Sequence, residues 1–331
     1  MFKRTDAIDI PLSDIADKSG IVKTIVVNDE LLVLKENSII KMMLAESIDA
    51  NDDYPETRHS YTKLFDLGTT SKIISRILVQ SSELLKFVDN KEKILTEIWK
   101  GNIFLINCSN SHNYLYESIN KLIPECENII NENKHARYIP ALPTVLELET
   151  NVNSYYQNAK LLLMQIFKLF QVFFNMPIKN RKEANFEMHI EWIKNKFGES
   201  SDLYKILDND ISWIRILSEC RNAIEHQKEG QSLNIKNFSL QPDNKFSAPL
   251  LSYELSRLSI KLESLDLLNE ISVTLDNLVD LYEDVIVMCI REKIKDKKTL
   301  SLFRIKDDDI DLKCPVYYTI GCNKNLINTL K

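Results

Sequence analysis

The sequence predicts a mostly α-helical fold: a C-terminal helical bundle with a small β-hairpin insertion, preceded by a mixed α and β N-terminal module. Apolar residues recur with the helical period of 3.6 along much of residues 145–295, whereas strand-like alternation is confined to short stretches. Two prolines in His135–Thr144 mark a linker. We therefore expect an N-terminal module at 1–140, a helical domain at 145–295 and a tail at 296–331.

The N-terminal module carries both strand and helix signals. Two short apolar runs flank Asn28 and Asp29, a pattern typical of a hairpin. The expected elements are a hairpin at Lys23–Lys35, helices at about 36–50 and 71–88, a strand at Gly101–Cys108 and a helix at about 111–131. These elements do not suggest a family for the module.

The C-terminal part is predicted to contain long helices interrupted by one hairpin. The expected elements are helices at about 145–176, 182–197 and 201–225, a hairpin within 232–246, and a helix from Tyr253 or Lys261 to Lys293. Pro177 and Gly198 are expected to end the first two helices. Ser301–Ile305 and Val316–Ile320 in the tail are candidate strands.

Composition excludes several classes of function. The chain has 331 residues and a net charge of -6, which argues against a broad surface that coats nucleic acid. It has six glycines and neither the P-loop nor the Rossmann glycine pattern, so a nucleotide site of either type is not expected. We expect no cofactor.

The cysteines and the apolar segments indicate the compartment. The six cysteines are scattered without a C-x-x-C pair, which suits thiols in a reducing cytosol better than disulfides or a zinc site. The N-terminus lacks the apolar core of a secretory signal. The longest apolar run, Leu161–Phe174, is interrupted by polar residues and is too short to cross a bilayer. We expect a cytoplasmic protein with no membrane contact and no bound metal.

The segment RNAIEH, Arg221–His226, lies near the end of the third predicted helix and places a charge on an apolar face. Arg221 falls about 40° from Leu217, inside the apolar stripe of that helix. A guanidinium keeps its proton at working pH and costs several kcal/mol to bury unpaired. Arg221 is therefore expected to meet a partner, a ligand or a subunit interface.

The residue types in this segment suit RNA cleavage without a metal ion. An imidazole can take the proton from a ribose 2′-hydroxyl, and its protonated form can donate to the leaving 5′-oxygen. A guanidinium can stabilise the charge that grows on the phosphate oxygens. Arg221, Asn222 and His226 are the candidate catalytic residues, with Asn222 orienting the histidine or a phosphate, and Glu219 and Glu225 are candidate supporting residues.

The segment and its helical context resemble the HEPN superfamily, all-α domains of toxin–antitoxin, abortive-infection and other defence systems. The resemblance rests on Arg221, Asn222 and His226, with four residues between Arg and His, and covers about 145–295. It implies an endoribonuclease that acts on RNA and leaves 2′,3′-cyclic phosphates. It also implies a homodimer with a composite active site and, in a toxin setting, a possible antitoxin or regulatory protein. The N-terminal module would supply sensing or target choice.

Helix geometry bears on the composite site. On a regular helix His226 lies about 140° from Arg221, so the two side chains cannot easily aim at one point. Either the helix breaks inside the motif or a partner subunit supplies the complementary group, and both alternatives fit a composite dimer site. Arg215, Glu219, Asn222 and His226 share one polar face of the helix.

Two other interpretations remain open. One is a catalytically inactive HEPN-like module that mediates dimerisation or binds a partner protein or a nucleotide. The other is a structural helical protein with a chance motif. In that case His226 interacts with the helix dipole, and Arg215 and Glu219 form an ordinary solvated pair.

Overall fold

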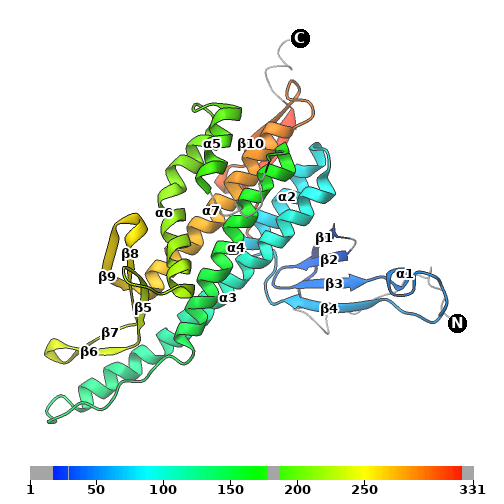
Figure 1. The fold of residues 1–331 in the computed structure, drawn as a ribbon. Coiled ribbons are helices and arrows are strands. Elements are labelled where there is room, and N and C mark those ends of the chain that lie inside the picture. The colour runs from blue at the N-terminus through cyan, green and yellow to red at the C-terminus, as the bar shows by residue number, and fades with distance from the viewer. Residues whose placement is uncertain (1–17, 29, 178–185, 323–331) are drawn as a thin grey trace. The chain divides into compact units, whose positions relative to one another are not determined.

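The computed structural model describes residues 18–28, 30–177 and 186–322. It is a mixed fold in which helices predominate and small antiparallel sheets accompany them (Figure 1). Contacts divide the chain into two units, one drawn from 1–102, 169–177 and 282–331, the other from 103–168 and 178–281. Three long helices contribute residues to both units: α3 (Lys91–Glu132), α4 (Leu148–Phe174) and α7 (Leu267–Lys293). The separate modules at 1–140 and 145–295 stay a prediction.

The first unit contains a four-stranded antiparallel sheet in chain order. Its strands are β1 (Ile21–Val27), β2 (Glu30–Lys35), β3 (Ile39–Met43) and β4 (Ser60–Phe65). The predicted hairpin is confirmed, because β1 pairs with β2 with Val27 opposite Glu30. The helix predicted over 36–50 is wrong: β3 occupies much of it, and only the short α1 (Ala45–Ile48) is helical. The apolar residues at Ile39–Met43 fit both the helical and the strand period. This segment is a strand because its backbone pairs with β2 and β4.

The helix predicted over 71–88 is confirmed, although its first part is a π-helix. It consists of η2 (Ile73–Val79), α2 (Gln80–Leu84) and η3 (Leu85–Phe87). Buried Glu283 of α7 accepts hydrogen bonds from Arg76 Nε at 2.7 Å and Gln80 Nε2 at 2.8 Å. Gln80 Oε1 in turn accepts from the backbone N–H groups of Tyr317 and Tyr318. These bonds attach the tail to the helices.

The two strands expected in the tail are confirmed as one antiparallel pair. They are β10 (Leu300–Arg304) and β11 (Tyr318–Cys322), with Leu302 opposite Ile320. The three-residue helix η6 (Asp307–Asp309) lies between them in the chain.

The strand predicted at Gly101–Cys108 is wrong, because this segment lies inside the continuous helix α3. The Tyr282 side chain of α7 packs directly against the backbone of α3 at Gly101. A Cβ at this position would lie 2.2 Å from the Tyr282 hydroxyl oxygen. That hydroxyl donates to the Ile98 carbonyl at 2.7 Å. A buried helix and a buried strand both appear as a short apolar run, so periodicity could not separate them. The helix predicted over 111–131 is confirmed as the second half of α3.

The helices predicted in the second half of the chain are largely confirmed. α4 matches the helix expected at 145–176, and Asn175, with φ of 56°, follows its end. α5 (Phe186–Phe197) stops before Gly198, and the first residues of the helix predicted at 182–197 lie outside the described part of the chain. α6 (Asp202–Glu225) is capped by Ser201, whose hydroxyl oxygen accepts from the N–H of Tyr204 at 3.3 Å.

The β structure of the second unit is larger than the predicted hairpin. β6 (Ser239–Gln241) and β7 (Lys245–Ser247) form that hairpin around the short helix η4 (Pro242–Asn244). A separate sheet consists of β5 (Gln231–Lys236), β8 (Leu250–Leu255) and β9 (Ile260–Asp266), with η5 (Ser256–Leu258) between the last two. The helix predicted from Tyr253 or Lys261 therefore begins only at Leu267, after Asp266 accepts from the N–H of Asn269 at 2.7 Å.

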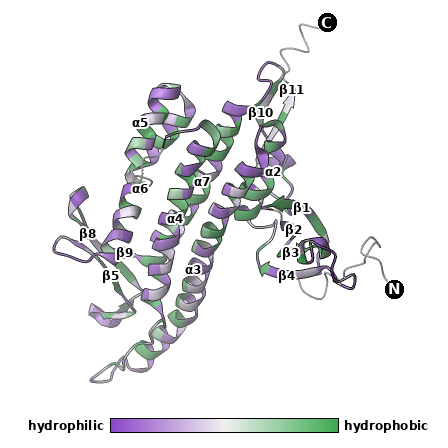
Figure 2. Ribbon diagram, turned by 45° about the vertical axis from the view of Figure 1, so that its right-hand side comes forward, coloured by the Kyte–Doolittle hydropathy of each residue, from purple (hydrophilic) through white to green (hydrophobic). Residues whose placement is uncertain are grey.

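Within the second unit, α4 contacts both α3 and α7. The buried Tyr155 hydroxyl donates to the Ile271 carbonyl at 3.1 Å, and the Cys108 thiol donates to the Tyr155 carbonyl at 3.7 Å. Figure 2 shows apolar residues interspersed with polar ones along α4 and α7, as expected for helices buried on part of their surface. Among the described residues, the helices lack the combination of length and apolar character that crossing a membrane requires.

Gly101→Ala is expected to lower the free energy of unfolding by about 1–3 kcal/mol, because the new methyl group overlaps the Tyr282 ring and hydroxyl. Urea denaturation monitored by circular dichroism measures the loss. Gly20→Ala is the matched control, since a Cβ at Gly20 meets nothing within 4 Å. Equal stability of the two variants would contradict the close approach.

Candidate functional site

The RNAIEH segment lies at the C-terminal end of α6, and the helix ends inside it. Glu225 is the last helical residue, and His226 is the C-cap with φ of -131° and ψ of 58°. The N–H of His226 still donates to the Asn222 carbonyl at 2.9 Å, while its side chain is 76% exposed. The helix therefore ends inside the motif, before the histidine, while a contribution from a partner subunit stays a prediction.

Arg221 is half-buried and has the partners that its charge requires. Its side chain is 20% exposed, its Nε donates to Gln157 Oε1 of α4 at 2.8 Å, and its Nη2 forms an ion pair with Glu225. A guanidinium has five N–H donors, so these two contacts leave further donors without a partner among the described residues. The arginine is thus fixed in position and can still bind an oxyanion.

The Glu225 carboxylate lies between the two residues of greatest chemical interest. One oxygen contacts Arg221, and the other lies 3.7 Å from His226 Nε2. Since both side chains reach the same carboxylate, a single chain brings the guanidinium and the imidazole together. Because His226 lies beyond the helix end, the angle of a regular helix does not describe these two side chains, and a composite site across two chains stays a prediction.

Asn222 connects α6 to a lysine on α4. Its Oδ1 accepts from Lys160 Nζ at 2.6 Å, and its Nδ2 donates to Glu219 Oε1 at 2.9 Å. Burial lowers the pKa of Lys160, as does the nearby charge of Arg221, while Glu219 and Glu225 act in the opposite direction. Two cations and two carboxylates therefore meet around Asn222.

Glu219 anchors this end of α6 to the neighbouring sheet. Its side chain is 13% exposed, and it accepts from Gln231 Nε2 at 2.8 Å and from Arg257 Nη1 at 3.4 Å. Burial alone would raise the pKa of Glu219, but the hydrogen bonds from Gln231 and Asn222, together with Arg257, outweigh it and lower the pKa. Glu219 is therefore held as a carboxylate.

The ordinary pair expected between Arg215 and Glu219 is wrong. Arg215 Nε donates instead to Glu187 Oε1 of α5 at 2.7 Å. Because α5 packs beside α6, the Glu187 carboxylate lies within reach of Arg215. The spacing of residues along α6 could not reveal this partner, since it belongs to another helix. The polar face predicted on α6 is thus divided, with Arg215 outside the cluster and Glu219 and Asn222 within it.

Sequence reasoning missed four residues of the site: Gln157, Lys160, Gln231 and Arg257. A signal for the first two existed, because Gln157 and Lys160 lie one turn apart beside the buried Tyr156 and Ala159 of α4. No sequence signal pointed to Gln231 and Arg257. Their positions depend on the pairing of β5 with β8, in which Gln231 lies opposite Leu255, directly before the η5 turn that carries Arg257.

A small hollow of about 180 Å³ adjoins the end of the motif. Its lining includes Ile224 and Gln227 from the end of α6, Asn153 from α4 and Asn234 from β5. Amide side chains both donate and accept hydrogen bonds, as the edges of nucleobases require. The hollow is therefore suited to a planar polar group next to the motif.

Comparison with family models, with curated proteins and with solved structures gave no match. In the described part of the chain, no three His, Cys, Asp or Glu side chains gather closely enough to hold a metal ion. What the cluster offers chemically is an exposed imidazole, two fixed cations and a carboxylate between the imidazole and one of those cations.

Glu219→Gln is expected to reduce the dependence of stability on pH in the acid range. Because the folded state lowers the pKa of Glu219, its contribution is fully present above the ordinary value of 4.5 and is lost as the pH falls through the lower, folded-state pKa. Melting temperatures between pH 6 and about pH 3 measure this for wild type and variant. Exposed Glu263, in Glu263→Gln, is the control. An unchanged acid profile in Glu219→Gln would contradict the anchor.

Proposed function

We propose that this cluster is the active site of an endoribonuclease that cleaves RNA by attack of the 2′-hydroxyl, without a metal ion. The observation that carries the proposal is the position of Glu225 between Arg221 and the exposed His226. A group that transfers protons and a cation that binds phosphate thus occupy the same end of α6. The residue types match the chemistry of the HEPN superfamily, which the motif resembles.

The reaction needs one proton removed and one supplied. His226 accepts the proton of the 2′-hydroxyl, and the 2′-oxygen attacks the adjacent phosphorus. The bond from phosphorus to the 5′-oxygen breaks, and that oxygen leaves with a proton from the imidazolium. The products are a 2′,3′-cyclic phosphate and a 5′-hydroxyl, so His226 returns to its starting state.

Arg221 and Lys160 carry the electrostatic part of the proposal. The remaining N–H donors of Arg221 bind the phosphate oxygens as negative charge grows on them. Lys160 adds a second positive charge and holds Asn222. Glu225 aligns the arginine and the histidine. The hollow beside Ile224 receives the base next to the cleaved bond.

The setting is proposed from the resemblance of the motif. It comprises a cytoplasmic toxin or defence ribonuclease that forms a homodimer and is restrained by an antitoxin or regulatory protein. We further propose that each chain of the homodimer holds its own complete active site, in place of the composite site that the resemblance implies. The reason is that Arg221 and His226 of one chain reach the same carboxylate.

An inactive binding module is the second candidate, and one observation favours it. Both polar atoms of Asn222 and two donors of Arg221 are already satisfied within the chain. A cluster that satisfies itself can hold α4, α6 and β5 together without a substrate. On this view the protein binds a partner protein or a nucleotide and leaves RNA intact.

Arg221→Ala and His226→Ala are each expected to abolish most RNA cleavage by the purified protein. Loss of the proton-transfer group should reduce the rate about 10²–10⁴-fold, and loss of the oxyanion donor about 10²–10³-fold. Cleavage of labelled RNA is followed with and without EDTA, which should have no effect. His135→Ala is the control, because His135 is exposed and lies outside the cluster. RNA left intact by the wild-type protein would favour the binding module.

Mixing the two inactive variants tests whether one chain suffices. Arg221→Ala and His226→Ala protomers, unfolded together and refolded, are expected to stay inactive, because each chain lacks part of its own site. A composite site would give a different result: a mixed dimer would contain one intact site, so an equal mixture would regain about a quarter of wild-type activity. Such recovery would contradict the single-chain site.

A further inference from the structure

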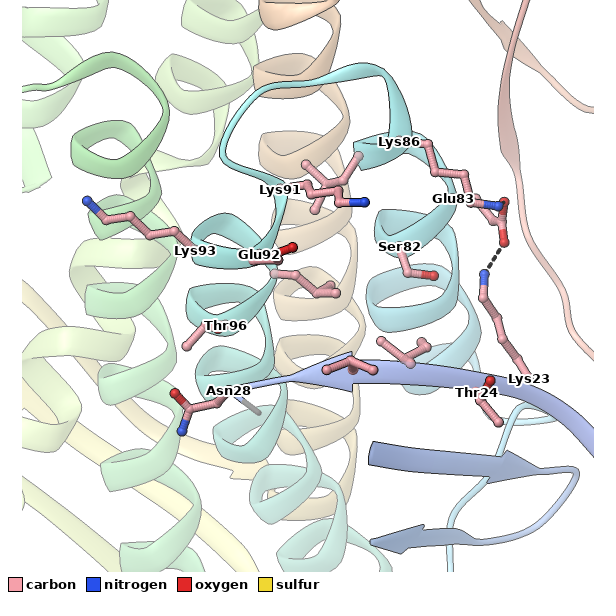
Figure 3. Close-up of a pocket in the computed structure, with 14 residues that line it drawn as sticks. Lys23, Thr24, Asn28, Ser82, Glu83, Lys86, Lys91, Glu92, Lys93 and Thr96 are labelled. Atoms are coloured by element: carbon pink, nitrogen blue, oxygen red, sulfur yellow. Dashed lines mark hydrogen bonds and ion pairs between the residues drawn. The ribbon is translucent and has the colours of Figure 1, made fainter. Parts of the chain in front are cut away.

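The first unit contains a cavity of about 650 Å³ that the proposed ribonuclease does not use. It lies between β1, the helical segment of α2 and η3, and the first turns of α3 (Figure 3). Its apolar lining comes from Ile25, Val26, Leu85 and Leu95. Pockets for small organic ligands range from about 300 to 1,000 Å³ and combine apolar walls with a few polar groups. The size and the mixed walls suit such a ligand.

Positive charge gathers at this cavity although the chain as a whole is acidic. Four lysines line it against two glutamates, whereas the net charge of the chain is -6: Lys23, Lys86, Lys91 and Lys93 against Glu83 and Glu92. Lys23 and Lys86 both form ion pairs with Glu83. Burial alone would raise the pKa of Glu83, but these two lysines lower it, so the carboxylate and its partners hold one another in place. They form a fixed wall of the cavity.

Lys91, like Lys93, differs from Lys23 and Lys86 in lacking a partner among the described residues. It forms no ion pair or hydrogen bond with any residue that the structure describes. In Figure 3 its side chain extends into the space between α3 and the α2 segment, whereas Lys93 points away from that space. Lys91 is therefore the ammonium group available to an anionic ligand.

Neutral polar groups complete the lining. Thr24, Ser82 and Thr96 supply hydroxyls from three different elements, and Asn28 supplies an amide at the end of β1. Hydroxyls and amides both donate and accept hydrogen bonds, although the Ser82 hydroxyl already donates to the Val79 carbonyl at 2.8 Å and is left as an acceptor. Such groups match the hydroxyls of a sugar and the edge of a base, while the apolar wall matches the face of the base.

We propose that this cavity binds a nucleoside phosphate, with Lys91 contacting the phosphate, the hydroxyl and amide groups the sugar and base edge, and the apolar wall the base. A phosphate requires a cation, an extended macromolecule would not need an apolar hollow of this size, and a purely apolar ligand would leave Lys91 and the hydroxyl and amide groups unused. The proposal does not depend on RNA cleavage by the other cluster.

Isothermal titration calorimetry of the full chain tests the site. The probes are the four ribonucleoside monophosphates and diphosphates, the corresponding uncharged nucleosides, and pyrophosphate. At least one nucleotide is expected to bind at least about tenfold more tightly than its nucleoside and than pyrophosphate. Lys91→Ala should weaken that binding by about tenfold or more.

Two further variants separate the site from nonspecific attraction. Thr96→Phe should abolish binding, because the ring fills the cavity from its half-buried α3 wall. Lys72→Ala is the matched control, since Lys72 is an exposed lysine of the same unit outside the cavity. Circular dichroism confirms that each variant is folded.

The proposal is overturned by any of three results. These are the absence of nucleotide binding in wild-type protein, binding of pyrophosphate as tight as that of every nucleotide, and equal weakening by Lys72→Ala and Lys91→Ala. Loss of binding with Lys91→Ala and Thr96→Phe, together with retention in Lys72→Ala, supports it.

Discussion

The half-buried guanidinium of Arg221 imposes the constraint on which the candidate site depends. A permanent charge on the packing face of α6 must be hydrogen-bonded, and Gln157 of α4 and Glu225 supply the acceptors. These contacts fix the rotation of α6 against α4, which places Asn222 beside Lys160. The same carboxylate that neutralises the arginine lies beside His226. One electrostatic requirement thus positions the residues to which we assign the chemistry.

A second carboxylate extends this arrangement to the β structure. Glu219 accepts hydrogen bonds from Asn222 on its own helix, from Gln231 at the start of β5, and from Arg257 after β8. The end of α6 is therefore held from two sides, by α4 through Arg221 and Asn222 and by the sheet through Glu219. This fixation leaves His226, beyond the helix end, as the exposed group of the cluster.

Part of this site could be predicted from the sequence. The angular position of Arg221 on a periodic helix showed that it needs a partner, but Gln157 lies 64 residues away in the chain and could not be identified by local spacing. The end of the helix at Glu225 agrees with the predicted range of about 201–225, although the sequence offers no glycine or proline there. In the fold, too, elements with a clear period could be predicted and elements fixed by distant contacts could not. α4 and α6 have a clear period, whereas α3 around Gly101 and the strands β3, β8 and β9 depend on contacts between distant segments.

The chemical nature of the ends left on cleaved RNA tests the central claim most directly. Purified protein is incubated with a defined RNA in EDTA, and the fragments are identified by mass spectrometry. Our account predicts 2′,3′-cyclic phosphate and 5′-hydroxyl ends, which disappear with His226→Ala. Fragments with 3′-hydroxyl ends, or the same cyclic ends from His226→Ala at an undiminished rate, would contradict it.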